Sequence, residues 1–256
     1  MSIIHNSTKN FLIIIVILII ITFPKNAFAS SLLVWPIRPV INHNSDATSL
    51  WLENRSSKPL TLQIRILQWQ HDLDGQRYAL QSQVISSPPF VTIAGNDRQL
   101  IRIHNRVAVP NGKELSWRII IDELPNASQS VTQTGVNFRI RYSLPLFAYG
   151  SGALNPSAAT PTEISNLVMK NSQWHISSDT NLNESYLYIQ NSSEFNWRIS
   201  DLLLFDDNNE VVITHEGLQG YLLPGATRKW KLGNEIKSIN SISFLVHGTN
   251  IHLERK

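Results

Sequence analysis

The sequence predicts an all-β protein made of two sandwich domains. Three observations support this prediction. Short runs of residues alternate or are wholly apolar, Pro, Gly, Asn and Asp interrupt them often, and no segment has a convincing helical period longer than two turns. Short strands at regular spacing with turn residues between them favour sandwiches over barrels.

The first domain is expected to contain six strands before Tyr149. The run Leu60–Trp69 is the clearest, because apolar Leu and Ile alternate with polar Thr, Gln and Arg at a period of two. Turn residues at 72–75 and 110–112 separate neighbouring runs. The predicted strands are Leu32–Ile41, Ser49–Glu53, Leu60–Trp69, Arg98–His104, Leu115–Asp122 and Val136–Leu146.

The composition changes after Tyr149. Residues 150–161 are small, flexible and punctuated by proline, which is typical of an interdomain linker. The sequence therefore predicts a first domain at 30–149, a linker at 150–161 and a second, smaller domain at 162–256. Strands are expected there at Trp174–Ser177, Glu184–Gln190, Trp197–Phe205, Glu210–Thr214, Arg228–Leu232 and Ile242–Val246.

The N-terminal residues 1–29 have the pattern of a signal peptide. Lys9 precedes an apolar run from Phe11 to Phe23, and Ala27 and Ala29 supply the small residues that a signal peptidase requires. A spanning helix needs about 20 apolar residues, so the run is short for an anchor. The alternative is an uncleaved membrane anchor. With cleavage after Ala29, we expect no stable membrane insertion of the remaining chain.

Charge and cysteine content exclude several classes of function. The formal net charge of +3 falls to +1 when Lys9 and Lys25 leave with the signal peptide, and no basic block remains. Nucleic acid is therefore a poor candidate partner, because phosphate binding needs a concentrated positive surface. The chain contains no cysteine, which excludes cysteine nucleophiles and thiolate metal sites.

No catalytic constellation is visible in the sequence. It lacks a Gly-X-Ser-X-Gly elbow, a phosphate-binding glycine loop and a His-Glu-X-X-His helix. The histidines are scattered singly, and no two of them share metal-ligand spacing beside a carboxylate; His215-Glu216 is only a weak candidate. We therefore expect no enzyme activity, no cofactor and no metal site.

The stretch from Val136 to Phe147 carries the first functional signal. In a strand, Val136, Phe138, Ile140 and Tyr142 point to one side, and Arg139 and Arg141 to the other. Pro145 cannot donate to a ladder, which favours a sheet edge. An edge strand with a long apolar row suggests a partner strand. The alternative is an ordinary core strand with two solvated arginines.

The second signal is Arg38, an isolated cation in the apolar run Leu32–Val40. Pro36 and Pro39 flank it, and prolines disfavour helix and interrupt strand pairing. The alternative is a surface arginine whose stem lies along apolar neighbours while its charge stays in water.

The order and spacing of these residues resemble the periplasmic pilus chaperones of the PapD type. The resemblance covers nearly all of the first domain, and the run 142–147 is most similar to the archaic branch of that family. In the second domain it extends only to Leu222–Gly225. The matching segments are Val34–Val40, Ala47–Asn54, Ser87–Phe90, Arg98–Ile103, Glu114–Pro125 and Arg139–Tyr142.

This resemblance implies two immunoglobulin-like sandwiches arranged as an L, with the binding cleft between them. It implies that the last strand of the first domain complements a fimbrial subunit that lacks one strand. The chaperone then delivers the subunit to an outer-membrane usher, so the expected location is the periplasm. The donor side chains would be Val131, Val136, Phe138 and Ile140.

The resemblance also assigns charged residues. Arg38 and Arg141 would hold the C-terminal carboxylate of the subunit, and Arg102 and Glu114 would form a charge pair near the cleft. Arginine can grip a carboxylate through two parallel hydrogen bonds. Pro145 stands near the place of a third charged residue in the family, which is a departure from the pattern.

Two other kinds of protein remain open at this point. A secreted carbohydrate-binding sandwich would stack sugars on exposed Trp35 and Trp230. A fibre subunit would be one incomplete domain with an N-terminal donor extension, whereas this chain predicts two domains and no long extension of that kind.

Overall fold

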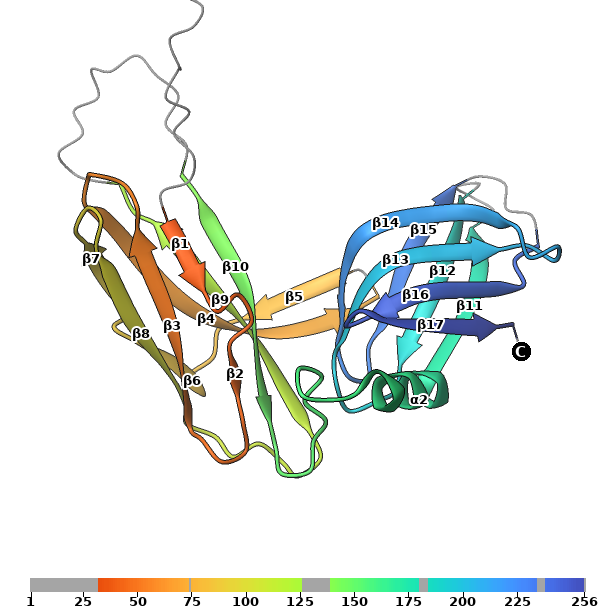
Figure 1. Cartoon of the computed structure of the whole chain (residues 1–256), viewed down its shortest axis with the longest axis horizontal. Helices are drawn as coiled ribbons and strands as arrows, with labels where there is room; N and C mark the ends of the chain where they lie inside the picture. Colours follow the sequence, from red (N-terminus) through yellow and green to blue (C-terminus); the bar gives the residue numbers. More distant parts are fainter. Residues whose placement is uncertain (1–31, 74, 126–138, 180–183, 234–237, 256) are drawn as a thin grey trace, which may run out of the picture. The chain divides into compact units, whose positions relative to one another are not determined.

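The computed structural model describes residues 32–73, 75–125, 139–179, 184–233 and 238–255. These residues form four β-sheets and one helix (Figure 1). The two-sandwich all-β prediction is confirmed, since strands before residue 150 make two facing sheets and strands after 171 make two more. Within these ranges no helix is long and apolar enough to cross a membrane.

The first sandwich packs two sheets around one core. One sheet has the order β1 (Leu32–Trp35), β3 (Ala47–Asn54), β8 (Arg98–Asn105) and β6 (Val84–Ser87). The other has the order β2 (Val40–Ile41), β10 (Arg141–Tyr149), β9 (Glu114–Glu123), β4 (Leu60–Asp72) and β5 (Gly75–Ala79), with β7 (Phe90–Ile93) also pairing with β4.

The second sandwich is built in the same way. One sheet has the order β11 (Ser172–Asp179), β12 (Glu184–Asn191) and β15 (Thr227–Gly233). The other has the order β14 (Val211–Leu222), β13 (Trp197–Phe205), β16 (Ser241–Val246) and β17 (Thr249–Glu254). Strands β5, β6, β7 and β17 were not predicted, because they are short or lack a clear apolar alternation.

The period of two in β4 determines which side chains enter the first core. Leu60, Leu62, Ile64 and Ile66 are all buried, while the intervening side chains are only half-buried. They pack against residues of the facing sheet such as Leu50, which is completely buried. This is the outcome expected for a strand with one face on a core.

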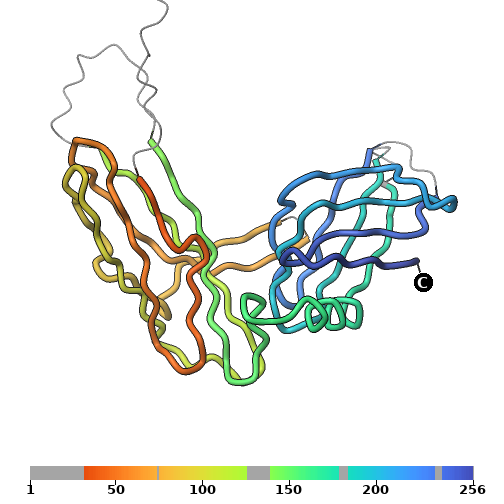
Figure 2. Tube along the Cα trace, viewed as in Figure 1, coloured from red at the N-terminus to blue at the C-terminus, as the bar shows by residue number. Residues whose placement is uncertain are grey.

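The N-terminal run changes sheets instead of forming one strand. β1 pairs antiparallel with β3, whereas β2 pairs in parallel with β10 in the opposite sheet. The prediction of a continuous strand at Leu32–Ile41 was therefore wrong. Pro36 and Pro39 lie in the break, where they cannot donate to either ladder, and the crossing carries Arg38. The trace of the chain passes directly from β1 to β2 (Figure 2).

Helix α2 (Pro161–Asn171) was also missed by the sequence analysis. Thr160 and Glu163 form a capping box, and Pro161 occupies the first helical position. Ile164 and Val168 are its buried residues. A helix with only two buried apolar positions has a weak period. The capping residues were the signal that could have predicted it.

Each sandwich contains a buried asparagine, in an Asn-X-Ser triplet, whose side chain hydrogen-bonds backbone carbonyls. Asn54 donates to the carbonyls of Lys58 and Ile93 at 2.8 and 3.1 Å. Asn191 donates to the carbonyls of Phe195 and Leu222 at 2.9 and 3.1 Å, and its Oδ1 accepts from Ser193. The two asparagines are fully buried and satisfy loop carbonyls that water does not reach.

Aromatic residues of the first sandwich also enter the core of the second. Trp69 and Phe147 belong to the second hydrophobic cluster, and each ring lies less than 6 Å from the ring of Tyr221. The guanidinium carbon of Arg118 lies 3.8 Å from the centroid of the Trp69 ring. Burial lowers the pKa of Arg118, and the ring face compensates part of the lost hydration.

We expect Asn191→Ala to lower the free energy of unfolding by about 1–3 kcal/mol, because it leaves buried carbonyls without a donor. Urea denaturation followed by tryptophan fluorescence measures this change. Asn208→Ala, on an exposed turn, is the control and should leave the midpoint in place. Equal midpoints for the two variants would contradict the role assigned to Asn191.

Candidate functional site: an open strand edge beside Arg38

Strand β10 is paired fully on one edge and hardly at all on the other. All nine of its residues pair with β9, but only Phe147 and Ala148 pair with β2. Within the described ranges no strand covers the second edge of residues 141–146. The edge position predicted from Pro145 is therefore confirmed for this part of the chain. Such an edge presents unpaired backbone groups to a partner strand.

The side chains of β10 alternate as the sequence predicted. Tyr142 and Leu144 pack against the first core, and the hydroxyl of Tyr142 donates to the backbone carbonyl of Leu32 in β1 at 2.8 Å. Arg141 points to the opposite side and is exposed. Ile140, just before the strand, is also exposed at 37%. Val131, Val136 and Phe138 lie outside the described residues.

Arg141 is held by an acidic neighbour on the adjacent strand. Its Nε donates to Asp122 at 2.5 Å, and Arg65 donates to the other oxygen of the same carboxylate at 2.7 Å. Desolvation opposes ionisation of Asp122, but the hydrogen bonds from Arg141 and Arg65 outweigh it and lower its pKa. The Arg141 side chain is 65% exposed, so a ligand has access to it.

Arg38 lies in the crossing between β1 and β2 and contacts residues from the second half of the chain. Its guanidinium contacts Nδ1 of His247 at 3.2 Å and donates to Oγ of Ser157 at 3.4 Å. The arginine is half-buried rather than extended into solvent. Arg38 is therefore not a surface arginine whose charge lies only in water.

The two arginines lie along the same edge but contact different residues. Val40 pairs with Phe147 in parallel, so Arg38 lies near the level of Pro145, four residues from Arg141. At about 3.3 Å per residue this is about 13 Å along the strand. A strand that lies along residues 141–146 therefore passes Arg141 and approaches Arg38.

Arg102 and Glu114 are not brought together. Arg102 is exposed on β8 between Ser49 of β3 and Ser87 of β6, in the sheet that faces the one containing Glu114. No ion pair joins them in the described residues. The expectation of a charge pair fails because β8 and β9 belong to different sheets, and Arg102 points to solvent while Glu114 is buried.

Glu114 instead binds the turn that precedes β13. Its Oε2 accepts from the backbone N–H of Asn196 at 3.0 Å and from the Asn196 side chain at 2.6 Å. Burial raises the pKa of Glu114 to about 7. Sequence reasoning missed Asn196, since nothing about an asparagine in a loop indicates a partner 82 positions away.

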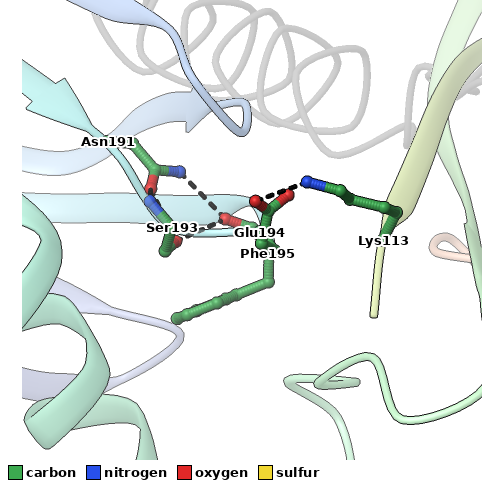
Figure 3. A network of polar contacts seen from close by, with 5 residues as sticks. All are labelled: Lys113, Asn191, Ser193, Glu194 and Phe195. Atoms are coloured by element: carbon green, nitrogen blue, oxygen red, sulfur yellow. Dashed lines mark hydrogen bonds and ion pairs between the residues drawn. The ribbon is translucent and has the colours of Figure 1, made fainter. Parts of the chain in front are cut away.

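The turn that carries Asn196 is itself rigid. Ser193 donates to Oδ1 of Asn191, both residues donate to the carbonyl of Phe195, and Glu194 forms an ion pair with Lys113 at 2.6 Å (Figure 3). Lys113 and Glu114 are consecutive, so two adjacent residues of the first sandwich meet the same turn. A cavity of about 410 Å³ lies next to Glu114 and is lined on its other side by Leu223–Ala226.

The two tryptophans proposed for sugar stacking are not open platforms. Trp230 is only 6% exposed and belongs to the second core. Trp35 is half-buried and stacks on Trp51 across the β1–β3 pair, with ring centroids 6.1 Å apart. The expectation that Trp230 is exposed was wrong, because alternation in β15 turns it inward.

We expect Glu114 to contribute stability that is lost as the pH rises towards 7. His71 and His247, whose pKa values are lowered to about 4, contribute in the opposite direction, so the Glu114 component is the difference between the parent and Glu114→Gln. The pKa of Glu114 is about 7 when folded and 4.5 ordinarily, so between these values the folded chain binds more protons than the unfolded chain. The stabilisation from protonated Glu114 is complete below about pH 4.5 and lost above pH 7, a change of about 3 kcal/mol. Urea midpoints between pH 5 and 8 measure it.

Glu114→Gln should remove this component of the pH dependence, because glutamine does not ionise. Glu194→Gln, an exposed carboxylate 80 positions later, should keep it. A Glu114→Gln variant with the parental pH profile would contradict the assignment.

Comparisons with known proteins agree with this architecture. Residues 32–152 match the family described as pili and flagellar-assembly chaperone, PapD N-terminal domain. No curated protein sequence matches the chain. The chain is similar to the chaperone in the CsuC–CsuE pre-assembly complex of archaic chaperone–usher Csu pili from Acinetobacter baumannii, with 30% identity and a TM-score of 0.67. That likeness covers 87% of this chain and 98% of the other.

More distant structures share the fold. The CupB2 chaperone of Pseudomonas aeruginosa is 17% identical, with a TM-score of 0.56 over 87% of this chain and 98% of its own. The Salmonella enterica complex of SafA pilin with the SafB chaperone gives 15% identity and a TM-score of 0.60 over 89% and 97%. Because its identity to the Csu chaperone extends over nearly all of that protein, the chain belongs to the PapD-like family of pilus-assembly chaperones.

Proposed function

We propose that this chaperone stabilises fimbrial subunits by adding β10 and the residues before it to a subunit that lacks one strand. The observation that carries the proposal is the edge of residues 143–146, with which no strand of the described residues pairs and which lies beside Arg38. An extended segment placed on this edge gains a continuous ladder of backbone hydrogen bonds. The chaperone in return gains partners for the N–H and C=O groups of an edge that is otherwise exposed.

Backbone pairing alone does not select one register, because a strand that slips by two residues keeps the same face toward its partner. The proposal assigns register to Arg38 and Arg141, which would bind the C-terminal carboxylate of the subunit. Arg141 is exposed and bound by a single carboxylate, so it is available for exchange. Hydrogen bonds to charged groups contribute about 1.5–3 kcal/mol each.

Apolar side chains before β10 would fill the groove of the subunit. Ile140 is the described member of this set and is exposed as a donor residue requires. Val131, Val136 and Phe138 are its proposed partners, from residues that the structure does not describe. Burial of one such side chain is worth about 1.5–3 kcal/mol before the cost of ordering the two chains.

The proposal places this activity in the periplasm, after removal of residues 1–29, and passes the subunit to an outer-membrane usher. Residues 30–149 would form the subunit-binding domain, joined through 150–161 to the second domain at 162–256. The relatives named for chaperone–usher pili support this assignment. Release requires only a better-fitting strand from another subunit, and the proposal therefore needs no catalysis.

We expect Arg38→Ala and Arg141→Ala each to weaken binding of a peptide with a free C-terminal carboxylate by about 10- to 100-fold, the equivalent of one charge-assisted bond. The probe is a synthetic 12-residue peptide of alternating valine and serine, titrated by calorimetry. The same peptide with a C-terminal amide should bind the variants and the parent equally.

Arg102→Ala is the matched control, since it removes one exposed arginine from the other sheet. Equal preference of Arg38→Ala, Arg141→Ala and the parent for acid over amide would exclude the carboxylate anchor. Unfolding midpoints of each variant separate lost binding from lost folding.

Ile140→Asp should prevent capture of a co-expressed fimbrial subunit while leaving the unfolding midpoint nearly unchanged, because an exposed side chain contributes little to the free fold. Co-purification measures capture. Val212→Asp is the control, since Val212 in the second sandwich is exposed to nearly the same extent, 38% against 37%. If Ile140→Asp unfolds the chain, or captures the subunit normally, Ile140 is not a donor residue.

A further inference from the structure

The turn between β16 and β17 has a conformation that is unusual for its first residue. Val246 pairs with Thr249, and the two residues between them, His247 and Gly248, have φ angles of 51° and 86°. Positive φ at both central positions defines a hairpin turn in which Asn-Gly and Gly-Gly are preferred. Histidine adopts this conformation less readily than glycine. A side chain other than glycine at such a position invites the question of what that side chain contacts.

The ring of His247 bridges two groups with opposite hydrogen-bonding character. Nε2 lies 2.8 Å from the backbone carbonyl of Asn196, and Nδ1 lies 3.2 Å from a guanidinium nitrogen of Arg38. A carbonyl only accepts and a guanidinium only donates, so the proton is on Nε2 and the lone pair of Nδ1 faces Arg38. The backbone N–H of Arg198 lies farther from Nε2, at 3.4 Å.

The ring is neutral at ordinary pH. Burial lowers the pKa of His247 to about 4, with the charges of Arg38 and Arg198 adding to the lowering and the hydrogen bond to Asn196 opposing it. A neutral ring has a lone pair to offer a cation, whereas a protonated ring would repel Arg38. The charge state and the tautomer therefore agree with the geometry.

The contacts form a chain from the first sandwich to the second and back. Glu114 binds the N–H and side-chain amide of Asn196, the carbonyl of Asn196 binds His247, and His247 binds Arg38. Asn196 is fully buried, so its position is well determined by its neighbours. Arg38 is thus hydrogen-bonded to His247, which is in turn hydrogen-bonded to the buried turn at Asn196.

We propose that His247 is a positioning residue for Arg38: its Nδ1 accepts one guanidinium N–H and holds the arginine in place for an incoming carboxylate. This inference rests on the proposed function of Arg38 as the carboxylate anchor. The guanidinium has five N–H donors, of which His247 and Ser157 use two, and in the described part of the chain three remain for a ligand. An arginine that is already ordered loses less conformational entropy when it binds.

The test replaces His247 by glycine and by asparagine. Glycine suits the backbone conformation and removes the acceptor, so His247→Gly should weaken binding of the free-carboxylate peptide by about 2- to 12-fold, the cost of ordering one side chain. The amide peptide should bind as before. The urea midpoint is expected to fall, because the carbonyl of Asn196 loses its partner, but that loss does not account for weaker binding confined to the acid peptide. Asparagine also suits the turn and places an oxygen at the position of Nδ1, so His247→Asn should restore most of the affinity.

A double-mutant cycle distinguishes positioning from a general structural role. In an Arg38→Ala background, His247→Gly should have no further effect on the acid peptide, because the residue it positions is gone. A loss that persists in this background, an equal loss for acid and amide peptides, or no rescue by asparagine would overturn the inference.

The outcomes also separate this inference from the proposed function. If Arg38→Ala selectively weakens binding of the acid peptide and His247→Gly does not, Arg38 is an anchor that needs no positioning by His247. If Arg38→Ala leaves the acid-over-amide preference intact, both the anchor and its positioning residue are excluded.

Discussion

The two edges of β10 differ in backbone pairing, and the proposed binding site depends on this difference. One edge of the strand pairs with β9 along its whole length, and on the other edge the described part of the chain places only the short pairing of Phe147 and Ala148 with β2. Pairing with β9 keeps the strand extended, so its free edge is presented without a cost of ordering at the moment of binding. Residues 147 and 149 pack into the second hydrophobic core, which fixes the end of the strand next to Arg38.

The free edge exists because the N-terminal strand leaves it uncovered. β1 pairs with β3 in the opposite sheet and reaches β10 only as the two-residue β2. Pro36 and Pro39 make the crossing irregular, and the irregular segment holds Arg38 where a regular strand would place a paired residue. The same break therefore exposes the edge and positions the cation at its end.

Contacts between the two halves of the chain combine packing with buried polar groups. Trp69, Phe147 and Tyr221 provide apolar contact, while Glu114 and His247 meet on the two sides of Asn196. Both titratable groups have their neutral forms favoured by burial. A buried network of this kind is stable only when its members satisfy one another, and it specifies one arrangement of the turn around Asn196.

The sequence alone determined the elements whose signal is local. Alternation in Leu60–Ile66 predicted which side chains are buried in β4, and Pro145 predicted an edge position for β10. The resemblance in Val34–Val40 and Arg139–Tyr142 predicted Arg38 and Arg141 as site residues, and their role as the carboxylate anchor stays a proposal. The capping residues of α2 were present, but its apolar period was too weak to predict the helix.

Only the tertiary structure decided which distant residues meet. The sheet change after Trp35 and the separation of Arg102 from Glu114 follow from how the sheets pair. The contacts of Asn196 and His247 join residues 51 to 209 positions apart, and no local pattern encodes them. Hydrogen bonds and burial act through space, so the partner of a polar side chain is settled only when the sheets have packed.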